Sequence, residues 1–182
     1  MPLTIGQRPD HGFDEPLGLL SDCHRRIEHF LLVLTTAADR LAGGKLGEAE
    51  RRHLEGALTY FATAAPRHTA DEEESLFPRM AASNDRDAKA SLELLERLES
   101  DHKEANRHHE AVDRLVRQWL ADGTLIEAAV LELKQHLAAL NALYAAHIAH
   151  EDREVFPAAA RILSASDIEA IGREMAARRS IR

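Results

Sequence analysis

An eleven-residue pattern that occurs twice constrains the fold more than any other feature of this chain. HTADEEESLFP at residues 68–78 aligns with HIAHEDREVFP at 147–157, and the His, Ala, Glu, Phe and Pro positions are shared. We call these two segments the first and second cassettes. A histidine also precedes the start of each cassette, by 44 residues for His24 and by 45 for His102. Self-similarity of this kind predicts two supersecondary units of one design in tandem.

Four long segments of the sequence carry an apolar stripe of helical period. Leu, Ile, Val, Phe and Ala recur at steps of three and four over residues 16–43, 48–78, 87–121 and 124–147, which predicts amphipathic helices. The composition agrees, because alanine, leucine, glutamate and arginine dominate over β-branched and aromatic residues.

Turn and cap residues give the expected ends of these helices. Gly43-Gly44 ends the first, and Pro78 with the Ser-Asn-Asp turn at 83–85 closes the second after a kink at Pro66. Two segments have the spacing of a capping box, Thr124–Glu127 before the fourth helix and Ser166–Glu169 before a short last helix.

Short connections between long helices favour one architecture. We expect an all-α protein, an antiparallel up-down-up-down four-helix bundle with a short extra C-terminal helix. Its expected parts are an extended lead-in at 1–15, the bundle at 16–160, and a C-terminal helix at 161–182 packed on the bundle.

Charge and composition exclude several classes of partner. The formal net charge is -8 with no concentrated basic face, which argues against nucleic acid and an anionic membrane surface. No apolar run approaches the length of roughly 20 residues that a membrane span needs. The N-terminus has no apolar signal segment, and the single cysteine, Cys23, fits a reducing compartment. We therefore expect a cytoplasmic protein.

Each cassette places a histidine and a glutamate on the apolar face of its helix. Residues four apart share a face, so His68 projects with Glu72, and His147 with Glu151. Helical steps back from either histidine follow the leucine stripe, while the neighbouring charged residues turn towards solvent. We expect that solvated set to be Glu73, Glu74, Asp152 and Arg153.

The bundle core therefore receives four imidazoles and two carboxylates, because His24 and His102 also lie on apolar seams. A carboxylate buried alone is very costly, whereas pairing or metal coordination makes it tolerable. The set suits two metal ions, each with two histidines and both bridged by the glutamates. Oxygen and imidazole ligands without thiolate favour iron or manganese over a structural zinc.

The order H–HxxxE–H–HxxxE, with each HxxxE running into LFP or VFP, resembles the hemerythrin-like, HHE cation-binding family over residues 16–160. The strings CHRRIEHFL and PRHTADEEESLFP look like bacterial members of it. The resemblance implies a four-helix bundle that holds two non-haem iron ions with an oxo or hydroxo bridge. Carried over by position, the implied ligands are His24, His68, Glu72, His102, His147 and Glu151.

This chain departs from the oxygen-carrying members at two positions. Asn106 stands where they have a further histidine, and the last carboxylate, Glu151, follows its histidine by four residues rather than five. The resemblance therefore implies open coordination positions and chemistry with O2, H2O2 or NO, as a catalase-like or NO-processing oxidoreductase or as a sensor. The expected partners are small diatomic ligands or peroxide.

Several histidines outside the implied ligand set have more than one interpretation. His150 forms a rival HxxxE with Glu154, although the repeat favours an outer or exposed position for it. His109 and His136 fit a buried hydrogen-bonded pair, a proton relay or, for His109, a fifth ligand. Tyr60 and Tyr144 have two interpretations, as hydrogen-bond donors to the ligands or as packing residues only.

Other functions are compatible with the same pattern. The main alternative is an iron-binding buffer, or an iron- or oxygen-responsive interaction module, without turnover. A ferritin-like di-iron oxidase needs two core ExxH motifs, and the chain has one, which ends at His102. A metal-free bundle would leave the core glutamates and histidines uncompensated.

Overall fold

The computed structural model describes residues 10–83 and 86–180, and of residues 86–92 only the backbone. Every regular element in this part of the chain is a helix, so the all-α prediction is confirmed. In chain order the elements are α1 Pro16–Leu41, α2 Glu48–Asp71, the π-helical η1 Glu72–Leu76, α3 Phe77–Ala82, α4 Arg86–Asp122, α5 Glu127–His150, the π-helical η2 Glu151–Val155, α6 Phe156–Ile162 and α7 Ala165–Arg178. None of the helices in the described ranges is long and apolar enough to cross a membrane.

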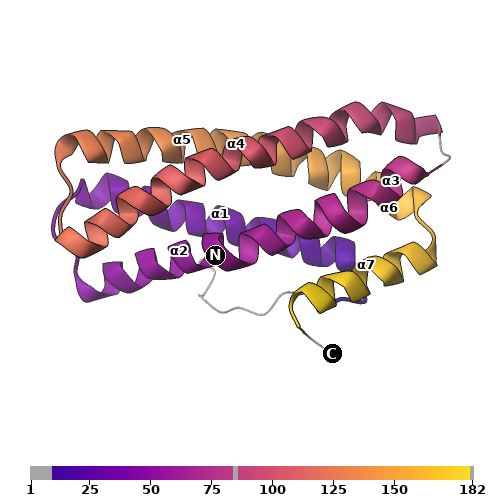
Figure 1. Cartoon of the computed structure of the whole chain (residues 1–182), viewed down its shortest axis with the longest axis horizontal. Helices are drawn as coiled ribbons and strands as arrows, with labels where there is room; N and C mark the ends of the chain where they lie inside the picture. Colours follow the sequence, from indigo (N-terminus) through magenta and orange to yellow (C-terminus); the bar gives the residue numbers. More distant parts are fainter. Residues whose placement is uncertain (1–9, 84–85, 181–182) are drawn as a thin grey trace.

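The four long helices lie side by side along the length of the molecule (Figure 1). Helix α1 contacts α2 and α5, and α4 contacts α5 and α2, so each long helix has two long neighbours. This arrangement is consistent with a helical bundle. Helix α7 lies beside the bundle near one of its ends (Figure 1) and contacts α1, α2 and η1.

The apolar interior consists of two separate clusters. The larger one contains Ile27, Leu58, Trp119 and Leu137, and the smaller one contains Leu20, Leu76, Leu98, Phe156 and Met175, all buried. Each long helix places a histidine of the repeated pattern between the two clusters. These histidines are His24, His68, His102 and His147. A buried polar layer thus divides the core, and the candidate metal ligands form it.

The helix of each cassette widens at its glutamate and continues past its proline. The second helix therefore ends not at Pro78 but at Ala82, directly before Ser83, the first residue of the expected turn. The amide of Phe77 donates to the carbonyl of Glu72, and that of Phe156 donates to Glu151, five residues back in both cases. Proline has no amide hydrogen and its ring collides with the carbonyl four residues earlier. A π-helical turn before Pro78 or Pro157 avoids that collision, and the helix continues.

Two of the expected helix caps are wrong. Helix α5 begins at Glu127 after Ile126, without a side-chain cap, so Thr124–Glu127 forms no capping box. The capping box of α7 lies two residues earlier than expected, between Ser164 and Asp167. The segment before α7 holds several residues that prefer caps, and spacing alone did not select the right one, whereas α5 begins without any side-chain cap.

The described part of the lead-in lies against the molecule. His11 donates its backbone amide to Asp22 Oδ2 at 2.9 Å. A Cβ added at Gly172 of α7 would lie 1.9 Å from the carbonyl oxygen of Phe13, so only glycine allows this close approach. Residues 1–9 of the expected lead-in lie outside the described residues, as do positions 84 and 85 of the expected turn.

Candidate metal centre

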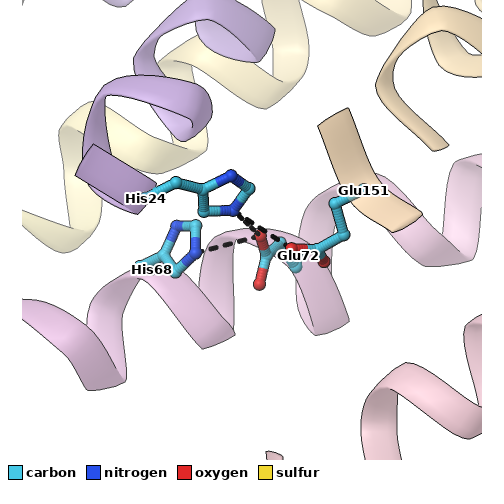
Figure 2. A group of neighbouring side chains, drawn as sticks. All are labelled: His24, His68, Glu72 and Glu151. Carbon is cyan, nitrogen blue, oxygen red and sulfur yellow. Dashed lines mark ion pairs between the residues drawn. The ribbon is translucent and has the colours of Figure 1, made fainter. Parts of the chain in front are cut away.

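The structure brings all six sequence-predicted ligands together in the polar layer. His24 comes from α1, His68 from the last turn of α2, and Glu72 from the first residue of η1. Figure 2 shows these three with Glu151, the first residue of η2, and their functional atoms point towards one another. His24 Nε2 lies 3.1 Å from Glu151 Oε2, and His68 Nε2 lies 3.2 Å from Glu72 Oε1.

The other two histidines complete a second group around the same carboxylates. His102 Nε2 of α4 lies 3.4 Å from Glu72 Oε2, and His147 Nε2 of α5 lies 3.2 Å from Glu151 Oε2. Two sets of four residues therefore have ligand atoms within 4.8 Å of one another. One set contains His24 and His68, the other His102 and His147, and Glu72 and Glu151 belong to both. Shared carboxylates are what a pair of bridged metal ions requires.

The inward-facing atoms of this centre lack ordinary hydrogen bonds. All six side chains are buried, with His102 the most exposed at 6%. Among the described residues, neither oxygen of Glu72 or Glu151 has a hydrogen-bond partner, and the same is true of His24 Nε2 and His147 Nε2. Buried polar atoms are nearly always satisfied, so a cluster of orphaned oxygens and imidazole nitrogens indicates a site that can hold a cation. The donor set fits a metal.

Two acidic residues that were expected to face solvent also contact candidate ligand histidines, although Asp152 is exposed as expected and Glu73 is half-buried. Asp152 Oδ1 lies 3.0 Å from His24 Nδ1, and Glu73 Oε1 lies 2.8 Å from His102 Nδ1. Such outer carboxylates fix the orientation of a metal-binding imidazole and raise its basicity. Each one follows the core glutamate of a cassette, so the alignment of the cassettes contained this signal. We missed it because a residue next in sequence usually points to another helix face.

The remaining two histidines have unequal partners. His147 Nδ1 lies 3.4 Å from Asp101 Oδ2. By contrast, His68 Nδ1 is buried and has no hydrogen-bond partner in the described part of the chain. Cys23 precedes His24 as Asp101 precedes His102, and its thiol is buried. The two halves of the centre therefore differ at the Nδ1 atom of the cassette histidine, which contacts a carboxylate in His147 and has no described partner in His68.

Burial and the neighbouring carboxylates shift the pKa values of three candidate ligand histidines in the metal-free protein. Burial alone would lower the pKa of His24, but its contacts with Asp152, Glu151 and Glu72 raise that pKa well above the ordinary value. Burial also opposes the charged form of His102, yet Glu72 and Glu73 raise its pKa to about 9. For His68 burial prevails and lowers the pKa to about 4. Metal binding must therefore displace protons from His24 and His102.

A small cavity of about 10 Å³ adjoins the centre. It is lined by all four candidate ligand histidines and by Tyr144, among other residues. A space of this size holds about one water molecule. The centre thus has room for a very small ligand beside it.

The other titratable residues singled out in the sequence lie outside the two metal groups. His109 Nε2 lies 3.1 Å from Tyr144 Oη, whereas His136 pairs with His108 through their Nδ1 atoms at 2.8 Å. The expected pairing of His109 with His136 is therefore wrong. His150 is partly exposed and contacts Glu154 at 2.7 Å, in agreement with an outer position. These residues, and Tyr60, whose hydroxyl donates to the Cys23 carbonyl, belong to neither group.

Helix α7 clamps the outer face of the first cassette. The carboxylate of Asp71, fully buried, accepts from Arg178 Nη1 at 3.0 Å and from Arg179 Nη2 at 2.6 Å. Ser75, also buried, accepts from Arg178 at 2.8 Å and donates to Glu174 at 2.5 Å. These contacts hold the π-helical turn that carries Glu72.

Comparison with known proteins agrees with this geometry. The chain is 27% identical over 175 residues to an uncharacterized protein of Haemophilus influenzae, and the alignment covers 93% of each chain. Residues 15–159 match the hemerythrin HHE cation binding domain. The matched region contains both cassettes, His24 and His102, and it spans most of the chain. This protein therefore belongs to the hemerythrin HHE cation-binding domain family.

Proposed function

We propose that this chain is a non-haem di-iron protein that binds O2, H2O2 or NO, and that senses, reduces or dismutates the bound molecule. Its first iron would be held by His24 and His68, its second by His102 and His147, and both by Glu72 and Glu151. The observation that carries the proposal is the membership of both glutamates in both groups of four. Two separate mononuclear sites would not share their carboxylates.

The chemistry of the donors is compatible with iron. Carboxylate oxygens and imidazole nitrogens without thiolate suit iron or manganese. Bound iron supplies redox chemistry with small oxygen and nitrogen ligands, and the chain supplies the environment. Asp152 and Glu73 orient His24 and His102, while the buried apolar clusters on either side exclude bulk water. The cavity of about 10 Å³ limits ligands to a few atoms, which fits diatomic molecules and peroxide.

An antiparallel arrangement of the four long helices is part of this proposal. The connection between α1 and α2 covers only residues 42–47, and that between α4 and α5 only residues 123–126. Helices that are joined so closely and that contact each other run in opposite directions. This topology lets two repeated hairpins each give one seam histidine and one cassette to a common centre.

Metal loading tests the proposal directly. We expect anaerobic reconstitution with Fe(II), followed by air, to give about two irons per chain and near-ultraviolet bands of oxo-to-iron charge transfer. Iron well below this content, without such bands, would contradict a di-iron centre. A Mn(II) titration under the same conditions serves as the comparison, because the ligands alone do not distinguish the two metals.

Reactivity of the loaded protein separates turnover from storage. Peroxide consumption and NO binding by the di-iron form would support an enzyme or a sensor. An iron-loaded centre that does not react with peroxide, NO or O2 would instead support iron buffering.

A further inference from the structure

A second, larger cavity lies on the surface between α2 and α4. Its volume is about 460 Å³, and its lining includes Phe61 and Ala62 of α2 and Asn106 and His109 of α4. Asn106 and the neighbouring Glu110 are exposed, so water reaches this cavity from outside. We call it the outer cavity, and the space of about 10 Å³ beside the ligand histidines the inner cavity.

One hydrogen-bonded pair joins the two cavities. His109 lines the outer cavity and Tyr144 lines the inner cavity. Their side chains meet at 3.1 Å, from His109 Nε2 to Tyr144 Oη. The ring of Phe61 packs against His109 at 4.3 Å between centroids and restricts its orientation. A hydrogen-bonded connection of two residues thus links the two cavities.

The protonation states of the pair suit transfer of a proton. Burial lowers the pKa of His109 to about 4, so its imidazole is neutral at neutral pH. Tyr144 is buried, and its hydroxyl lies 3.1 Å from the His109 imidazole nitrogen. A neutral imidazole has one nitrogen that donates and one that accepts, and a phenol hydroxyl does both.

We propose that His109 and Tyr144 form a proton relay from the outer cavity to the small molecule bound at the metal centre. Tyr144 Oη–H donates to an atom of that molecule and passes its proton to it. His109 Nε2–H replaces the proton on Tyr144, and His109 Nδ1 takes one from a water of the outer cavity, which becomes hydroxide. One proton enters and one leaves, and neither side chain gains charge.

The relay requires the His109 tautomer with its proton on Nε2, to which the imidazole returns after each transfer. The inference rests on the proposed function, because the di-iron centre is what binds the acceptor. It adds a route for protons that the candidate ligands do not supply. His24, His102 and His147 have their Nδ1 atoms in outer contacts, and His68 Nδ1 is buried without a hydrogen-bond partner in the described part of the chain.

Azide is a suitable anionic probe of the donor to the bound molecule. In the ferric protein, Tyr144→Phe removes the proposed hydrogen bond and is expected to weaken azide binding about tenfold or more. The vibrational frequency of bound azide should shift in D2O for the wild type and not for the variant. Tyr60→Phe is the matched control, because Tyr60 is equally buried and donates to the Cys23 carbonyl instead.

Exchange of the Tyr144 hydroxyl proton tests the outer half of the relay without metal. In the metal-free protein, nuclear magnetic resonance should show this exchange slowed at least about tenfold by His109→Phe, since a positioned imidazole accelerates proton transfer strongly. His108→Phe is the control, because His108 contacts His136 and not Tyr144.

The outcomes distinguish the relay from the di-iron proposal. Unchanged azide binding in Tyr144→Phe, or unchanged hydroxyl exchange in His109→Phe, overturns the relay while a wild-type di-iron spectrum upholds the centre. A wild-type protein that forms no di-iron centre overturns the proposed function and removes the acceptor of the relay with it.

Discussion

Asp71 and Ser75 of the first cassette are buried beneath α7, whereas the residues at the same positions of the second cassette, His150 and Glu154, face solvent. The inner faces of the cassettes are alike, because each begins with a histidine and turns into a π-helix at its glutamate. The shared inner face is what two equivalent metal positions require. The outer faces are free to differ, and the chain uses that freedom to attach α7 on one side only.

The comparison extends to the groups behind the ligand histidines. Both seam histidines have an outer carboxylate at 2.8–3.0 Å, Asp152 for His24 and Glu73 for His102. Each carboxylate comes from the cassette of the other hairpin, so the hairpins hold each other's ligands. Only the cassette histidines break the symmetry, because His147 has Asp101 and His68 has no such partner among the described residues.

Glu72→Ala tests the symmetric part of the centre and has the largest expected effect. The variant removes a carboxylate that belongs to both metal groups, so the iron content should fall from about two per chain to below about one. Glu151→Ala should have the same effect, and iron analysis with the charge-transfer spectrum measures both. Glu74→Ala is the matched control, because Glu74 contacts Arg178 on the surface. Retention of two irons by Glu72→Ala would show that the carboxylates are not shared.

The clamp on the first cassette is the largest asymmetric feature. The double variant Arg178→Ala/Arg179→Ala leaves the Asp71 carboxylate buried without its cations, which should lower the free energy of unfolding by about 3–5 kcal/mol. Urea unfolding of the metal-free protein measures the change. Adding Asp71→Asn to the double variant should recover part of the loss, since it removes the buried charge.

The second cassette offers the comparison for that experiment. Glu154→Ala breaks an exposed contact with His150, and its cost should lie within about 0.5 kcal/mol. If Glu154→Ala lowered the free energy of unfolding as much as Arg178→Ala/Arg179→Ala does, the contacts of α7 would not distinguish the two cassettes.

The outer carboxylates should contribute equally to both hairpins. Asp152→Asn and Glu73→Gln keep the shape of each side chain and remove its charge, which should weaken metal binding about 10–100-fold in each case. Competition with a chelator measures the affinity. Arg153→Ala, at a position next to Asp152 on the exposed face, should leave it unchanged. Unequal losses of metal affinity in the two variants would mean that one metal position depends more on its outer carboxylate than the other.

Most of this symmetry was readable in the sequence, and most of the asymmetry was not. The apolar stripe fixed the phase of His68, Glu72, His147 and Glu151, because a helix of constant pitch carries phase over many residues. The same rule did not predict the contacts of Glu73 with His102 and of Asp152 with His24. A π-helical turn begins at each core glutamate, and beyond it the α-helical phase no longer holds.

Contacts between distant segments account for the remaining errors. Asp71 looked like one acid in a charged run, and its partners Arg178 and Arg179 lie more than a hundred residues later. Nothing in local periodicity predicts which helix face a short C-terminal helix will cover. The pairing of His136 with His108 rather than His109 likewise depends on how α4 and α5 are rotated against each other.

Stability of the metal-free protein should depend on pH through His102. Its pKa is raised to about 9 in the folded protein, against about 6.5 when unfolded, so the protonated form stabilises the fold. This contribution is complete below pH 6.5 and is lost as the pH rises towards 9. Thermal unfolding across this range should show the decline, and Glu73→Gln should reduce it, because Glu73 helps to raise the pKa. Metal-loaded protein should not show it, since the metal replaces the proton.

The smallest expected effect concerns the cassette histidines. Asp101→Asn removes the charged partner of His147, and because their contact is long at 3.4 Å, metal affinity should fall by less than the 10–100-fold expected for Asp152. His68 has no such partner among the described residues, so the variant makes the two halves of the centre alike in this respect. A chelator titration of the variant should then release its two metals over a narrower range of chelator concentration than the wild type does. A wider range would show that the difference between the metal positions arises elsewhere, with the α7 clamp on the first cassette as the next feature to remove.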